Sequence, residues 1–247
     1  MAFEVVLDVD RRELEGAVFV TGFRGFGMVG YLVSKYLALL LNAKRVGYIL
    51  TDSMPPVVLI EDDGPGYPYD IYLVEEPKTV IVVNRALPER EHTDEYVWSL
   101  AEWASRIKPK AAVLVGGLRV EYKPEDEKHG YRYIANKFYQ GPSLEAPQME
   151  VGLGVMGPLA LLYIHMDYHQ VPAVIFLPYT TAEEADWEAA AFGVKFIANK
   201  FLGRDVDVKT LEEMGVKQKE LIEQLMKMIQ QEEAGESEGK ERPGIYM

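Results

Sequence analysis

The residues best placed to do chemistry are the glycines of segment 22–30, which reads Gly-Phe-Arg-Gly-Phe-Gly-Met-Val-Gly. Gly25, Gly27 and Gly30 have the Gly-x-Gly-x-x-Gly spacing of a dinucleotide-binding turn. In such a turn, backbone N–H groups approach a pyrophosphate at the start of a helix. Asp52 follows the next predicted strand, where it could contact a ribose. One candidate function is therefore an enzyme that binds a nucleotide or another phosphorylated ligand at this turn.

Two features favour a structural role for the same turn. The predicted strand ends at Thr21, whereas a dinucleotide-binding turn has its first glycine at the end of the strand. Phe23 and Phe26 would also crowd an anionic ligand. In a structural role, small residues allow the strand, turn and helix to pack closely. These residues are Gly22, Gly25, Gly27 and Gly30.

Other polar clusters carry weaker signals. His165 and His169 have the i,i+4 spacing of metal ligands on a helix, but Pro172 indicates that the helix ends there. The acidic clusters at 61–63 and 183–184 lie at turns or helix starts, where acids are common. A Gly-x-Ser-x-Gly motif is absent from the sequence. We expect no catalytic residue, no metal and no cofactor, and hence a protein that is not an enzyme.

The C-terminal residues have an unusual composition. Segment 234–244 contains no apolar side chain larger than Ala or Pro, so residues 234–247 should form a flexible tail. Ile245, Tyr246 and Met247 then follow abruptly. A terminal carboxylate, an aromatic hydroxyl and an apolar side chain form a compact recognition unit. We expect these three residues to dock on a partner, with a chance occurrence of tyrosine as the alternative.

Strands and helices alternate along residues 1–205. Apolar patterns predict strands at 3–9, 17–20, 46–50, 71–74, 79–83, 111–115, 131–134 and 171–177. Helices are predicted at 28–41, 93–107, 157–166 and 182–202, and a hairpin is expected within 118–151. This alternation predicts an α/β core domain, residues 1–205, with a mainly parallel sheet and helices on both faces.

Residues 206–233 are predicted to form a C-terminal helix. Its apolar face is too wide for a helix surrounded by water. The face comprises Leu221, Ile222, Leu225, Met226, Met228 and Ile229. The helix either packs back on its own domain or forms a contact between subunits, and the sequence leaves both readings open.

Composition excludes several classes of protein. With 26 basic and 39 acidic residues among 247, the net charge of -13 disfavours binding to nucleic acid. Without cysteine there are no disulfides or thiolate metal sites. Apolar runs are too short to span a membrane, and the N-terminus lacks a secretory pattern, so we expect a cytoplasmic protein without membrane contact. Abundant Glu and Lys without Cys fit a thermophile.

Three blocks of sequence resemble the archaeal-type proteasome assembly chaperone family. The first is Gly22-Phe23-x-Gly25-x-Gly27-x-Val29-Gly30, followed by Tyr36-Leu37 and 46–49. The second is the glycine-containing segment 154–162, and the third is Asp186-Trp187-Glu188-Ala189-Ala190. Arg24 stands where the family typically has proline, and a further glycine of the second block is missing near Leu159. Together the blocks extend over residues 1 to about 230.

The resemblance implies a nucleoside-phosphorylase-like α/β fold without established catalysis. It also gives the tail a meaning, because Ile245-Tyr246-Met247 resembles the hydrophobic-Tyr-any motif of proteasome activators and assembly factors. Such tails insert between neighbouring α-subunits of the proteasome core particle. By that resemblance, the Met247 carboxylate would pair with a lysine of the partner, Tyr246 would position the tail, and Ile245 would fill an apolar recess.

A single short tail should bind weakly, whereas several tails on one oligomer would raise avidity by about 10²–10⁴. We therefore expect a homo-oligomer, a tetramer or pentamer, that acts without ATP as a proteasome assembly chaperone or activator. A scaffold that pairs with a paralogous chaperone subunit is a further alternative.

Overall fold

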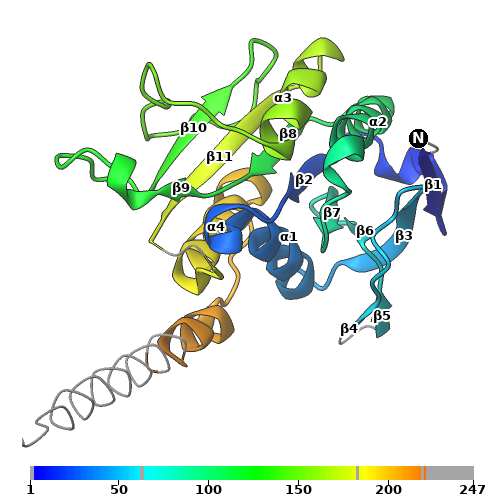
Figure 1. The fold of residues 1–247 in the computed structure, drawn as a ribbon, viewed down its shortest axis with the longest axis horizontal. Coiled ribbons are helices and arrows are strands. Elements are labelled where there is room, and N and C mark those ends of the chain that lie inside the picture. Colours follow the sequence, from blue (N-terminus) through cyan, green and yellow to red (C-terminus); the bar gives the residue numbers. More distant parts are fainter. Residues whose placement is uncertain (1–2, 62–63, 182–183, 218–219, 221–247) are drawn as a thin grey trace, which may run out of the picture.

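The computed structural model describes residues 3–61, 64–181, 184–217 and 220, which form a β-sheet with helices on both faces (Figure 1). The strands on the main path of the sheet are β1 (Phe3–Leu7), β2 (Val18–Gly22), β3 (Lys44–Thr51), β6 (Tyr69–Val74), β7 (Thr79–Asn84), β8 (Ala111–Val115), β10 (Tyr131–Ala135) and β11 (Ala173–Thr180). Short strand β9 (Leu118–Arg119) pairs with the end of β11, while β4 (Leu59–Glu61) and β5 (Gly64–Gly66) form a separate hairpin. The α-helices are α1 (Val29–Leu40), α2 (Thr93–Arg106), α3 (Pro158–Tyr168) and α4 (Trp187–Leu202).

The sheet is parallel at its centre and antiparallel on its flanks. The strand order is β1-β3-β6-β7-β2-β8-β11-β10. Strands β7, β2, β8 and β11 pair in parallel, whereas β1, β3, β6 and β10 join the sheet through antiparallel pairs. The predicted α/β class, with a mainly parallel sheet covered on both faces, is confirmed.

The central strands are apolar on both faces because helices cover each face. Every residue of β8 is buried. Its Leu114 packs with residues of α2 and α3, and its Val113 packs with residues of α1 and α4 on the opposite side. This two-sided burial explains why the strand reads as a continuous apolar run rather than an alternating one.

The helix ends follow local sequence signals. The Asp186 carboxylate caps α4 by accepting a hydrogen bond from the Ala189 N–H at 2.9 Å, and the left-handed Gly203 ends that helix. Pro158 occupies the first turn of α3, where the missing N–H costs nothing. Asp94 and Glu95 lie in the first turn of α2 and favour its positive end.

Two features of the sheet differ from the sequence-based expectation. The hairpin expected within 118–151 is wrong, because β10 pairs antiparallel with β11, which follows it by more than thirty residues. The β4–β5 hairpin was not predicted. Each of its strands has only three residues, which is too short for an alternating pattern to be visible.

The described start of the C-terminal helix packs on its own domain. Residues 209–217 are helical. Leu211 is fully buried with the residues of α1 and α4, and the Tyr36 hydroxyl lies 3.5 Å from the Met214 sulfur. The proposed subunit contact at 221–229 and the tail at 234–247 lie outside the described residues.

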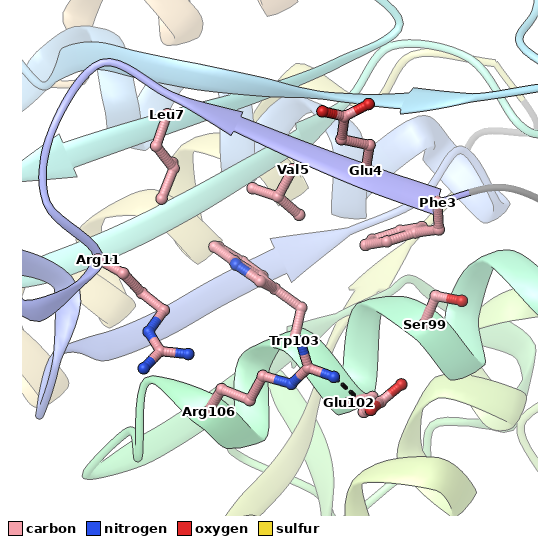
Figure 2. Close-up of a pocket in the computed structure, with 9 residues that line it drawn as sticks. All are labelled: Phe3, Glu4, Val5, Leu7, Arg11, Ser99, Glu102, Trp103 and Arg106. Atoms are coloured by element: carbon pink, nitrogen blue, oxygen red, sulfur yellow. Dashed lines mark hydrogen bonds and ion pairs between the residues drawn. The ribbon is translucent and has the colours of Figure 1, made fainter.

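Edge strand β1 packs against α2, and a pocket of about 450 Å³, called the hollow below, lies between them (Figure 2). Phe3, Val5 and Leu7 point toward α2, whereas Glu4 points to the other side of the strand, as a period of two requires. The ionisable side chains at its rim are exposed, and Arg106 already pairs with Glu102 at 2.5 Å. This hollow is therefore a weak candidate for a functional site.

A groove at the carboxyl ends of β2 and β8

The direction of chain connections changes between β2 and β8. These strands are parallel neighbours, and their last residues, Gly22 and Val115, stand in register. After β2 the chain enters α1 on one face of the sheet, and after β8 it passes through β9 and β10 before it reaches α3 on the other face. Crevices outside the carboxyl ends of such strands are where open α/β sheets bind ligands.

A groove of about 880 Å³ lies at this position. It is lined by residues 23–26, which directly follow β2, and by 115–119, which begin at the last residue of β8. Residues 152–159, which extend into the first turn of α3, also line it. Ligand sites typically have volumes of roughly 300–1,000 Å³ and mostly apolar walls. Two of the sequence blocks recognised above, the glycine turn at 22–30 and the segment 154–162, therefore meet in one groove.

At three glycines of the 22–30 turn, neighbouring atoms leave no space for a side chain. A Cβ on Gly22 would lie 2.5 Å from the Gly30 backbone. A Cβ on Gly30 would lie 2.3 Å from the Val115 carbonyl oxygen, and one on Gly27 would lie 2.3 Å from the Thr180 Oγ1. These distances are shorter than any ordinary contact, so the turn packs against β8 and β11 only without side chains there.

Asp186 ties the glycine turn to the start of α4. Its N–H donates to the Gly27 carbonyl at 2.8 Å. Its carboxylate accepts from the Thr180 hydroxyl at 2.7 Å and the Thr181 N–H at 3.1 Å, as well as capping α4. The third sequence block, which begins at Asp186, thus holds the first block in place.

The residues are not arranged as in a dinucleotide-binding site. In that fold the acidic residue follows a strand adjacent to the glycine turn. Here β6 and β7 separate β3 from β2, so Asp52 lies about three strand spacings, roughly 14 Å, from the turn. In addition, Thr180 and Asp186 already occupy the space in front of Gly27, the second glycine of the motif.

The second glycine segment opens into the groove. No atom of the described residues lies within 4 Å of a Cβ built on Gly152, Gly154 or Gly157, and the same holds for Gly25 in the first turn. Gly152 and Gly157 have φ of +96° and +80°, so their backbone conformation explains why they are glycine. Gly25 and Gly154 are outside the left-handed region, and neither packing nor conformation explains them.

Two arginines are the charged residues in the part of the groove lining that the structure describes. The Arg24 guanidinium lies 4.8 Å from the centre of the Tyr31 ring, and that of Arg119 lies 5.7 Å from the centre of the Phe26 ring. Arg119 also pairs with Glu121 at 3.3 Å, and the hydrogen bond from Arg119 lowers the pKa of the Glu121 carboxyl. Among the described residues that line the groove there is no histidine, cysteine, serine, lysine or carboxylate.

A buried arginine holds one wall of the groove. Arg132 of β10 is 1% exposed and lies 2.6 Å from carboxylate oxygens of both Glu127 and Glu150. A hydrogen bond from the His129 N–H, supported by Arg132, lowers the pKa of Glu127 to about 2. Because Glu150 immediately follows Met149, which lines the groove, these ion pairs fix the start of the 149–159 wall.

A second buried arginine has a comparable role elsewhere. Arg85, at the end of β7, bonds Asp70 at 2.7 Å and Glu61 of β4 at 3.0 Å, while Lys35 of α1 reaches Glu61 at 2.6 Å. Burial raises the pKa of Glu61, but the hydrogen bonds from Lys35 and Arg85 outweigh it and lower the pKa overall. This cluster attaches the β4–β5 hairpin to the sheet.

The histidine pair has other partners in the structure. The His165 Nε2 lies 2.9 Å from the Asp94 Oδ1, and the His169 ring packs against Trp98. Within the described residues, no group of three or more histidine, cysteine, aspartate or glutamate side chains is placed to hold a metal ion. Nor does any described helix have the length and apolar character needed to cross a bilayer.

The predicted docking residues, Ile245, Tyr246 and Met247, and the predicted subunit contact at 221–229 lie outside the described residues. The sequence reasoning missed Arg119, Tyr122 and Met149 as groove residues. Gly116 and Gly117, directly after a predicted core strand, were the available signal for this part of the groove.

Solved structures show the same fold. Pyrococcus furiosus PbaA, described as an archaeal homolog of proteasome-assembly chaperone, aligns with a TM-score of 0.70 at 22% identity over 96% of each chain. Pyrococcus furiosus PbaB, described as an archaeal proteasome activator, aligns with a TM-score of 0.70 at 18% identity over 91% of this chain and 98% of its own. A Thermoplasma acidophilum protein of unknown function aligns with a TM-score of 0.68 at 18% identity, covering 95% of this chain and 94% of its own.

A search of curated protein sequences gave no match. By contrast, residues 19–226 match the sequence model of the PAC2 family. This match covers the glycine turn, both walls of the groove and the start of α4. The chain therefore belongs to the PAC2 family, and its resemblance to proteasome assembly chaperones is confirmed at that level.

Proposed function

We propose that this protein is an ATP-independent proteasome assembly chaperone or activator that docks on the α-ring of the proteasome core particle through its C-terminal residues. Family membership carries the proposal. The likeness to PbaA and PbaB, described as a chaperone homolog and a proteasome activator, adds support. The sequence contributes Ile245-Tyr246-Met247, which fits the hydrophobic-Tyr-any docking motif.

Each tail residue has a separate role in this proposal. The Met247 carboxylate makes a charge-assisted bond to a lysine between two α-subunits, which is the strongest single interaction. The Tyr246 ring and hydroxyl set the position of the tail, and Ile245 fills an apolar recess. The Met247 side chain contributes little, because the motif accepts any residue at this position.

A binding role fits the chemistry of the groove better than catalysis. The groove residues that the structure describes offer two guanidinium groups and one phenol, without a base or nucleophile of the usual kinds. Elsewhere, Arg85 and Arg132 form ion pairs with carboxylates, and these pairs attach connecting segments to the sheet. We therefore place the function in surfaces that bind other macromolecules.

Oligomerisation would make the weak docking of single tails effective. A tetramer or pentamer presents several tails to one α-ring, which raises avidity by about 10²–10⁴. We propose the apolar face of residues 221–229 as the contact between subunits. Light scattering of the purified chain tests this step, and a stable monomer would contradict it.

The docking step is tested by co-sedimentation with an archaeal-type core particle. Deletion of Ile245 to Met247 should abolish binding, and so should Tyr246→Ala. Met247→Ala is the matched control and should bind like the unaltered chain. Two glycines added after Met247 should also abolish binding, because they move the carboxylate away from its lysine. Undiminished binding of the deleted chain would refute tail docking, although the family assignment would stand.

A further inference from the structure

We propose that the groove at the ends of β2 and β8 binds a small molecule with an apolar, preferably aromatic, body and one anionic group, a carboxylate or a phosphate ester. This site is separate from the C-terminal residues proposed to dock on the proteasome. Three independent properties of its described lining point to the same ligand chemistry.

The first property is an apolar surface left open. The floor is formed by buried residues that include Leu159 and Leu177. At the mouth, Phe26 is 46% exposed and Met156 is 83% exposed. Large apolar side chains that lie together on an exposed surface often mark a binding site. A ligand with an apolar body would remove this surface from water.

The second property is the empty space in front of Gly25 and Gly154. Neither glycine has a left-handed φ, and a Cβ on either would lie more than 4 Å from every atom of the described segments. A larger residue would therefore fit the fold at both positions but would project into the groove. Glycine here keeps the groove wide and exposes the backbone to whatever enters it.

The third property is the charge of the lining. In a chain with a net charge of -13, the charged residues among the described lining of this groove are Arg24 and Arg119. The Arg119 guanidinium lies over the exposed Phe26 ring, so an anion bonded to it would place its apolar body beside that ring. Glu121 is one ion-pair partner of Arg119, at 3.3 Å on the surface, and exposed pairs of this kind are weak. A ligand anion could therefore replace it.

The test uses three probes that share one aromatic body: naphthyl phosphate, naphthylacetate and neutral naphthylethanol. Titration calorimetry and saturation-transfer NMR on the full chain measure their binding. We expect saturable binding of all three, with both anions about tenfold tighter than the alcohol, because bonds to a guanidinium are charge-assisted. Similar affinities of phosphate and carboxylate would indicate a general anion site, and a preference for one would identify the natural group.

Variants separate the two parts of the site. Arg119→Gln should weaken the preference for anions, because Arg24 remains, and Arg119→Glu should abolish it, while the alcohol still binds. Glu121→Gln should tighten the anions by roughly threefold, since it removes the competing carboxylate. Gly154→Val should block all three probes by filling the groove. Arg12→Gln, on the surface away from the groove, is the control for a general loss of positive charge.

Circular dichroism and thermal unfolding establish that each variant is folded. If Gly154→Val is unstable, the exposed Arg119 and Glu121 variants still decide the question, because their predicted effects have opposite signs. The proposal is refuted if none of the probes saturates, or if Arg119→Glu leaves anion binding unchanged. These experiments contain no proteasome, so their failure is distinguishable from a failure of tail docking.

Discussion

The two glycine segments that border the groove are alike in sequence and different in structure. In the 22–30 turn, Gly22, Gly27 and Gly30 are pressed against other atoms, so that a Cβ would lie 2.3–2.5 Å from its neighbours. In the segment before α3, the glycines face open space. The glycines of the 22–30 turn allow close packing of the turn against the sheet, whereas those before α3 leave room for a ligand. A run of glycines therefore does not by itself indicate a phosphate-binding loop.

The largest expected effect is at Gly30. Gly30→Ala would place a Cβ 2.3 Å from the Val115 carbonyl oxygen and 2.7 Å from that of Phe23. Both are backbone atoms at the end of central strands and cannot rotate away. We expect a loss of about 3 kcal/mol or more in the free energy of unfolding, or failure to fold. Urea denaturation measures this loss, and a change below about 0.5 kcal/mol would show that the close packing is wrong.

A smaller loss is expected for Arg132→Met. The variant removes the ion pairs that hold the start of the groove wall through Glu150. At pH 7 the loss should be about 2 kcal/mol, since hydrogen bonds to charged groups contribute about 1.5–3 kcal/mol.

The pH dependence of this loss checks its cause. The pKa of Glu127 is lowered to about 2 in the folded chain from its ordinary value of 4.5. Its ionised form therefore stabilises the fold above pH 4.5, and this stabilisation is lost as the pH falls toward 2. The difference between the unaltered chain and Arg132→Met should narrow over this range. A difference independent of pH would assign the effect to packing of the arginine stem.

Gly27→Ala should cost less than Gly30→Ala. Its Cβ would meet the Thr180 side chain rather than backbone, although φ is +61°. The left-handed backbone contributes about 1 kcal/mol and the contact a similar amount. In the double variant with Thr180→Ala, the contact with Oγ1 is absent, so the two losses should be less than additive. Full additivity would show that the contact with Thr180 does not limit residue 27.

The smallest effect on stability is expected for Gly154→Ala. The added methyl group meets no atom within 4 Å, and the lower entropy of the unfolded chain could even stabilise the fold by about 0.5 kcal/mol. Thermal unfolding should therefore give an unchanged or slightly raised midpoint. A loss comparable to that of Gly30→Ala would abolish the distinction between the two glycine segments.

The sequence predicts the centre of the fold well. The strand at 111–115 has the bounds of β8, because burial on both faces produces a continuous apolar run. The helix predicted at 93–107 corresponds to α2, because its buried residues repeat every three to four positions. Such patterns are local, so they can be read from one segment at a time.

Other features depend on contacts between distant segments. The pairing of β10 with β11, the bond from the Asp186 N–H to Gly27 and the ion pair of Arg132 with Glu150 join residues far apart in the chain. The open or closed surroundings of a glycine likewise follow from the tertiary structure. The groove could therefore not be predicted from its separate segments. The family resemblance did include two of these segments, 22–30 and 154–162, but it did not indicate that they lie side by side.

The central claim is that the C-terminal residues, and not the groove, dock this protein on the proteasome. It is tested most directly by comparing the affinities of three chains for the core particle: unaltered, lacking 245–247, and Gly154→Val. We predict that the deletion abolishes binding and that Gly154→Val leaves it unchanged. Full binding by the deleted chain, or loss of binding in a folded Gly154→Val chain, would contradict the claim.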